Sequence, residues 1–247
     1  MARNQIHSIF LSALALIAAL IPTRPAAAQD PKQTYASMAP IEQYLMERDA
    51  EIALARSAAP DAISHEASVI VLTRHGYETA VAGKNGWVCW VGRGWMAMFE
   101  HPEFWSPKVR AAECLNPPAA RSVLPYVYKR TELILAGHSK PVAIAAIKAA
   151  IEKKELPALE PGSVSYMMSK GSYLTDSGGH NLPHLMFFET AKDGAAWGAN
   201  VTNSPVMAVN YWYLSADAFP PLTSFPPLSV FLIGVDKWSD GTPAPSM

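Results

Sequence analysis

VIVLTRHGYETAVAGKNGWVCWV, residues 69–91, is the stretch that decides between the folds open to this chain. Its β-branched and apolar residues predict strands over residues 68–73, 77–82 and 87–91. Gly83-Lys84-Asn85-Gly86 lies between the last two, and an Asn-Gly pair flanked by apolar stretches is the strongest short-range signal for a hairpin. We therefore expect the chain to reverse at residues 84–85 and residues 77–91 to form a β-hairpin.

The rest of the chain shows helices and strands in separate blocks. Helical spacing is found over residues 40–56, 119–136 and 139–154, with a bend expected at Pro125. Apolar runs predict strands at 164–168, 185–188, 206–214 and 228–235, of which we expect the first two to pair. Because the elements do not alternate strictly, we predict an α+β fold in which an antiparallel sheet packs against about three helices.

Residues 1–28 have the pattern of a secretory signal peptide. Arg3 precedes an apolar run of 13 residues, 9–21, and Ala26-Ala27-Ala28 fits the small-residue cleavage rule. The run is shorter than the roughly 20 residues that a membrane-spanning helix needs. We expect a periplasmic or secreted protein without a membrane anchor once the signal is cleaved. Its remaining parts would be a flexible leader at 29–39, a single α+β domain at 40–240 and a tail at 241–247.

The charge of the expected mature chain argues against nucleic acid as a partner. Removing Arg3 and Arg24 with the signal leaves 18 of the 20 basic residues against 21 acidic ones, a formal net charge of −3. Such a balance provides no basic surface for phosphates. The sequence also contains no Walker loop, dinucleotide fingerprint, Gly-x-Ser-x-Gly or His-Glu-x-x-His motif. We therefore expect no cofactor, and a small molecule or a protein as the partner.

The chain has two cysteines, Cys89 and Cys114, 25 positions apart. An even number of cysteines in an exported chain favours a disulfide over two free thiols, and a structural zinc site would need four ligands. Residues 92–118 read as a long loop, so we expect the bond to hold this loop against the predicted hairpin.

Arg74-His75-Gly76 follows a strand and resembles the opening of the histidine phosphatases and phosphoglycerate mutases. Leu133–Ser139 is similar to the second histidine region of that family, which implies phosphoryl transfer through His75 with His138 nearby. However, only 63 positions separate the two histidines, residues 77–88 read as strand and turn where a helix should start, and the second arginine motif is missing. We favour a simple turn at Arg74-His75-Gly76.

Two other groups of residues are candidates for binding. His180 and His184, with Asp176, could gather a metal ion for a hydrolase, although Pro183 excludes the helical His-x-x-x-His arrangement; the alternative is ordinary loop histidines. Trp95 and Trp105 belong to an aromatic cluster at residues 87–105 that could offer ring faces to a ligand or could form a small core under the loop.

Four segments carry a wider resemblance: NGWVCWV at 85–91, EPGSVSYMMSK at 160–170, PHLMFF at 183–188 and KWSDGTP at 237–243. Together they resemble a group of exported bacterial proteins that have no assigned activity. The resemblance implies export and a common fold, but it supplies no catalytic residues. We expect non-enzymatic binding of a small ligand or a protein through residues 92–118 and 176–184, with the metal-assisted hydrolase and the phosphatase as alternatives.

Overall fold

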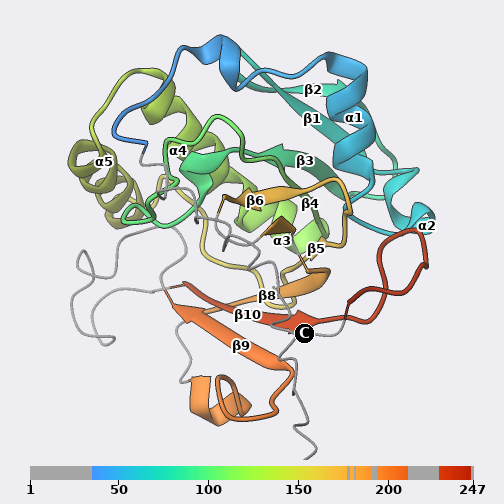
Figure 1. Ribbon diagram of the computed structural model, residues 1–247. Helices are drawn as coiled ribbons and strands as arrows, with labels where there is room; N and C mark the ends of the chain where they lie inside the picture. The colour runs from blue at the N-terminus through green and yellow to red at the C-terminus, as the bar shows by residue number, and fades with distance from the viewer. Residues whose placement is uncertain (1–34, 177–178, 181, 191–193, 211–227, 246–247) are drawn as a thin grey trace, which may run out of the picture. The chain divides into compact units, whose positions relative to one another are not determined.

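An eight-stranded sheet organises the computed structural model, in the strand order β2-β1-β3-β4-β5-β8-β10-β9 (Figure 1). The structure describes residues 35–176, 179–180, 182–190, 194–210 and 228–245. Neighbouring strands of this sheet are antiparallel except β1 and β3, which run parallel. The elements belong to one compact unit, Lys32–Met247, and the predicted α+β class with a mainly antiparallel sheet is confirmed.

The strands of the large sheet are β1 (Ser68–Thr73), β2 (Gly76–Val81), β3 (Val88–Gly92), β4 (Ala111–Leu115), β5 (Val164–Met167), β8 (His184–Thr190), β9 (Val206–Asn210) and β10 (Leu228–Gly234). A separate small sheet pairs β6 (Tyr173–Thr175) with β7 (Gly179–His180). The predicted pairing of residues 164–168 with 185–188 is confirmed by the β5–β8 ladder. Residues 211–214 of the third predicted strand lie outside the described residues.

The helices are α1 (Arg48–Arg56), α2 (Asp61–Ser64), α3 (Pro117–Ser122), α4 (Leu124–Leu135) and α5 (Lys140–Glu152), with short 3-10 turns η1 (Ile41–Gln43), η2 (Gly94–Met96) and η3 (Gly194–Trp197). The predicted helix at 119–136 is divided at Val123 into α3 and α4, with Pro125 in the first turn of α4, where a proline is tolerated. The predicted helix at 139–154 is confirmed as α5.

The first three strands differ from the predicted hairpin. β1 and β2 pair through a turn at Arg74-His75, and β3 lies on the other side of β1. Residues 83–86 therefore cross the start of β1 and do not join neighbouring strands, so the prediction of a hairpin there is wrong. Gly83 is required at the crossing, because a Cβ atom would lie 2.1 Å from the backbone nitrogen of Ser68. The expectation that the chain continues as a strand after Gly76 is confirmed.

The two faces of the sheet carry different cores. One face packs alanines of α1 and the segment after it against Val69, Val91 and the two cysteines. The opposite face packs α3, α4 and α5 against Trp90, Leu115 and Phe188. This alternation follows from the period of two in a strand, which places Trp90 and Cys89 on opposite faces of β3.

A disulfide joins Cys89 to Cys114, as expected, but it does not hold a loop. Cys114 belongs to β4, where it lies directly opposite Cys89 of β3 with 4.0 Å between the two Cα atoms. The expectation of a long irregular loop over 92–118 is therefore wrong at its end, where residues 111–115 form a strand and residues 117–122 form α3. The bond connects two strands that the sheet already holds in register.

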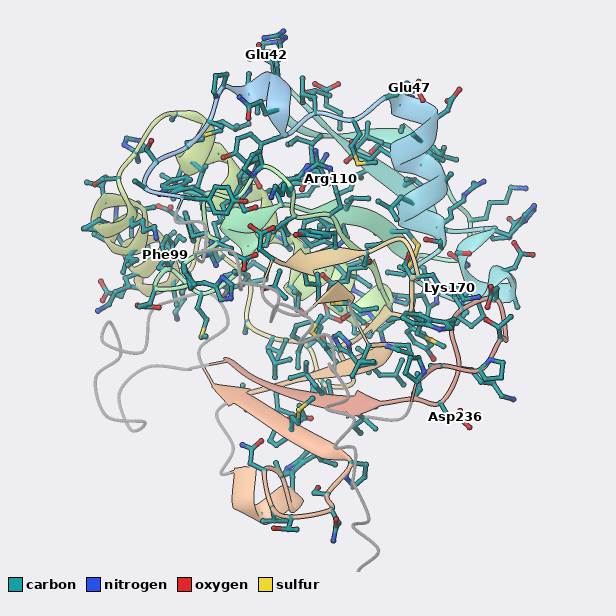
Figure 2. The ribbon with its side chains drawn as sticks, viewed as in Figure 1. Glu42, Glu47, Phe99, Arg110, Lys170 and Asp236 are labelled. Atoms are coloured by element: carbon teal, nitrogen blue, oxygen red, sulfur yellow. A yellow bond between two sulfur atoms is a disulfide. The ribbon has the colours of Figure 1, made fainter. Side chains whose placement is uncertain are left out.

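The chain before and after the domain core also makes ordered contacts. In the predicted leader, Tyr35 donates a hydrogen bond from its hydroxyl to Asp176 at 2.6 Å. In the predicted tail, Pro243 pairs with Lys237. Glu42 in η1 points away from the domain and forms an exposed ion pair with Arg74 (Figure 2). None of the helices within the described residues has both the length and the apolar character needed to cross a membrane.

Candidate functional site

A cavity of about 300 Å³ lies on the face of the sheet that α3 and α4 cover. Its volume is at the lower end of the range for ligand-binding pockets, which is about 300–1,000 Å³. The lining is mainly apolar and comes from the sheet, from residues 92–103, and from Val123 and Val127 beside and in α4. A few polar side chains are placed among these apolar groups, which is the usual composition of a site for a small organic molecule.

Four side chains form a row across neighbouring strands on the floor of the cavity. Trp90 of β3 is paired with Glu113 of β4, and Met167 of β5 is paired with His184 of β8. The register between β4 and β5 continues this alignment and places Glu113 beside Met167. Because adjacent strands are about 4.8 Å apart, the backbones of Glu113 and His184 are separated by roughly 10 Å.

Residues 93–103 cover this row. The segment turns at η2, and a Cβ atom on Gly94 would lie 2.7 Å from the carbonyl oxygen of Glu103, so only glycine fits there. Met96 and Met98 contribute side chains to the cavity, and Met98 is 36% exposed. The cover is therefore an apolar flap whose own backbone is packed tightly.

Cations from two helices hold the cover in place. Arg130 of α4 donates to the carbonyl oxygen of Ala97, and its guanidinium lies 4.1 Å from the centre of the Phe99 ring. Lys140, at the start of α5, donates to the carbonyl oxygen of Phe99 at 2.6 Å. Backbone and aromatic groups of the cover are thus fixed by the α4–α5 layer.

Glu113 is the most unusual polar group in the cavity. It is 7% exposed and forms no salt bridge within the described residues. Burial raises the pKa of its carboxyl group to about 7, although the neighbouring Ser165 hydroxyl partly opposes this increase. Near neutral pH, Glu113 is therefore present in both its protonated and its ionised forms.

His184 lies at the end of the row opposite Trp90 and offers a hydrogen-bond acceptor to the cavity. Its Nδ1 lies 2.7 Å from the carbonyl oxygen of Leu182, which can only accept, so Nδ1 carries the proton and Nε2 keeps its lone pair. Burial lowers the pKa of His184, an effect that the Leu182 hydrogen bond reduces. The imidazole is therefore neutral at physiological pH.

The charged groups Arg93 and Glu103 of the lining already form hydrogen bonds or ion pairs with other parts of the protein. Arg93 is fully buried, donates to the carbonyl oxygen of Tyr44 at 2.7 Å and pairs with Glu51 at 2.8 Å. Glu103 accepts hydrogen bonds from the Thr175 hydroxyl at 2.6 Å and from the Asp176 backbone at 2.9 Å. These contacts tie the cover to α1 and to the segment at β6.

The predicted histidine pair is only partly described. His184 lines the cavity, whereas the side chain of His180 lies outside the described residues. Asp176 is not part of the cavity lining. Its carboxylate forms an ion pair with Lys108 at 3.2 Å. Across the part of the chain that the structure describes, no group of three His, Cys, Asp or Glu side chains could hold a metal ion.

The predicted tryptophans belong to the main core. Trp95 is fully buried, lies 4.9 Å from the Tyr44 ring and donates to the Thr131 hydroxyl at 3.3 Å. Trp105 is 9% exposed and packs edge to face against Phe104. Neither residue is in the cavity lining, and both rings belong to the main core, Trp95 from within the cover segment itself.

His75 and His138 are both exposed and lie away from the cavity lining. His75 is in the turn between β1 and β2, where its backbone donates to the Thr73 hydroxyl at 3.0 Å. His138 follows the end of α4, with its backbone bonded to Leu133. The segment after His75 is strand β2, so no helix N-terminus is available there to hold a phosphate.

Glu113 was not among the residues proposed from the sequence. It stands between Ala112 and Cys114, and a charged residue inside an apolar strand is a recognisable signal for a functional group. The signal is masked because the prolines and irregular pattern of residues 92–118 predict a loop and not a strand. Trp90 belongs to the aromatic cluster at residues 87–105 that could offer ring faces to a ligand, and it does line the cavity, whereas Met167 was not proposed as a site residue.

Comparison of this chain with protein-family models, with curated proteins and with solved structures finds no match. The geometry of the cavity is therefore the basis for the functional proposal.

Proposed function

We propose that the protein binds a small, mainly apolar organic molecule in the cavity above Trp90, Glu113, Met167 and His184. The observation that carries this proposal is the Glu113 carboxyl group, which is buried in an apolar cavity without a salt bridge among the described residues. Such a group costs folding free energy, so its position favours a role in recognition over a role in stability.

The composition of the lining favours binding over catalysis by a serine, threonine, cysteine or lysine nucleophile. None of the described lining residues supplies a hydroxyl, thiol or amine nucleophile. The floor offers the Glu113 carboxyl, His184 Nε2 and the Trp90 indole N–H, which has no hydrogen-bond partner among the described residues, and these groups can orient a ligand.

We also infer that the protein functions outside the cytoplasm. Support comes from the Cys89–Cys114 disulfide, because such bonds persist in oxidising compartments, and from the signal-like composition of residues 1–28. N-terminal sequencing of protein recovered from a bacterial periplasm should give Gln29 as the first residue. Recovery of the uncleaved chain from the cytoplasm alone would contradict this inference.

The proposed site can be tested by NMR titration with 2-phenylethanol, a small neutral molecule. We expect shifts of the Trp90 indole and Val127 methyl signals, because both residues line the cavity. Ala111→Phe, which fills the cavity from β4, should abolish these shifts, whereas Val142→Phe on the exposed face of α5 should retain them. Equal binding by a folded Ala111→Phe variant would place the ligand elsewhere and contradict the proposal.

A further inference from the structure

The charges around the cavity are unbalanced. Arg93 is the single Lys or Arg side chain in the described lining, and its charge is matched by Glu51 at 2.8 Å. Two carboxyl groups, Glu103 and Glu113, share the same lining, and neither forms a salt bridge within the described residues. The electrostatic character of the empty space is therefore negative when these groups are ionised.

The floor of the cavity offers two acceptors to a ligand, in addition to the donor of the Trp90 indole. The Glu113 carboxylate accepts hydrogen bonds and cannot donate any, and His184 keeps an acceptor at Nε2 because its Nδ1 proton is bound by Leu182. Trp90 stands directly opposite Glu113 on the same face of β3 and β4, so an aromatic ring lies beside the carboxylate. An aromatic ring next to a carboxylate suits an organic cation, which both groups attract.

We propose that the ligand is an organic monocation, a protonated amine carried on an apolar body, with its ammonium group at Glu113 beside Trp90 and its apolar part against Met96, Val127 and Leu232. This inference rests on the proposed function, because it names the chemical class of molecule that the same cavity takes. The apolar lining excludes a bare inorganic cation, which would lose its hydration without enough oxygen ligands to replace it.

A matched pair of ligands tests the inference by isothermal titration calorimetry at pH 8, where Glu113 is mainly ionised. 2-Phenylethylamine and 2-phenylethanol share the same phenylethyl group. The amine carries a positively charged ammonium group at pH 8, whereas the alcohol carries a neutral hydroxyl. A hydrogen bond to a charged group is worth about 1.5–3 kcal/mol, so the amine should bind roughly 10- to 100-fold more tightly than the alcohol. Equal binding of both ligands, or tighter binding of the alcohol, would overturn the inference and leave the proposed function intact.

Two variants test whether Glu113 is the group that causes the preference for the amine over the alcohol. Glu113→Gln should bring the amine-to-alcohol ratio close to one, whereas Glu42→Gln, which removes an exposed carboxylate, should keep the wild-type ratio. A ratio that stays high in Glu113→Gln would assign the cation to another group and overturn the inference. If the wild-type protein binds neither ligand, the cavity is not a site for this class of ligand. Both the proposed function and the inferred preference for a cation would then be wrong.

Discussion

At the scale of single residues, buried charge is the feature that distinguishes this protein. Glu51, Arg93, Glu103 and Glu113 are all less than a tenth exposed, and they lie in or behind one cavity. Glu51 serves structure, since its carboxylate also accepts the Leu72 backbone N–H at 3.1 Å where β1 and β3 diverge. Glu113 lies beside the Ser165 hydroxyl and forms no salt bridge among the described residues, which is why we assign it to the ligand.

The raised pKa of Glu113 predicts a specific dependence of stability on pH. Its folded-state pKa of about 7 exceeds the ordinary value of 4.5, so the folded protein holds the proton more tightly. The corresponding stability is fully present below about pH 4.5 and is lost as the pH rises to about 7. Relative to Glu113→Gln, the wild-type free energy of unfolding should fall by roughly 3 kcal/mol between pH 4 and pH 8. Urea unfolding at both pH values measures this difference.

Glu42→Gln is the matched control for that experiment. A backbone hydrogen bond and then Arg74 lower the pKa of Glu42, so the stability that this residue contributes is lost as the pH falls. The difference between wild type and Glu42→Gln should therefore change with the opposite sign. A difference for Glu113→Gln that does not vary with pH would show that the carboxyl group is solvated.

The buried pair of Glu51 with Arg93 predicts a large effect of a single substitution. Glu51→Ala would leave the guanidinium of Arg93, which is fully buried, without its counterion. We expect a loss of about 3–5 kcal/mol in the free energy of unfolding. Arg74→Ala, which breaks an exposed pair with Glu42, should have a far smaller effect. Similar results for the two variants in urea unfolding would contradict the burial of the Glu51 pair.

At the scale of elements, the sequence predicted most helices and strands. It missed β4, placed the start of the first helix at residue 40 where α1 begins at Arg48, and misplaced one connection. Residues 84–86 carry a strong hairpin signal, yet a turn signal reports local geometry and not which strands become neighbours. β1 is apolar on both faces, with residues 69–72 each at most 4% exposed, so it is suited to the covered interior of the sheet, with a strand on each side, and not to an exposed edge. The chain satisfies this need by pairing β1 with β2 through Arg74-His75 and by passing residues 83–86 across to β3.

The disulfide between β3 and β4 should stabilise these elements without setting their register. Five paired positions, from Val88–Leu115 to Gly92–Ala111, already align the two strands. Replacing both cysteines by alanine should lower the free energy of unfolding by about 2–4 kcal/mol, mainly because the unfolded chain regains freedom. Urea unfolding of the variant measures the loss, and NMR of the cavity residues should still report the wild-type arrangement. An unchanged stability would contradict a formed disulfide.

At the scale of the whole molecule, the site could not be predicted from the sequence, because it depends on strand order. Trp90, Glu113, Met167 and His184 come from four strands that are spread over almost a hundred residues of chain, and only the order β3-β4-β5-β8 brings them into one row. His184 was proposed from its sequence context and does line the cavity. Trp95 was proposed as a ligand contact, but its apolar ring is enclosed by the core that supports the cover.

The most direct test of a buried ligand carboxyl group is the titration of Glu113 itself, followed by carbon-13 NMR of its side-chain carboxyl with Glu113→Gln used for assignment. We expect a midpoint near pH 7, as burial in the cavity requires, and a lower midpoint when 2-phenylethylamine is added, because a bound cation favours the ionised form. A midpoint near the ordinary value of 4.5 that does not move with the amine would contradict both the burial of Glu113 and its role in binding.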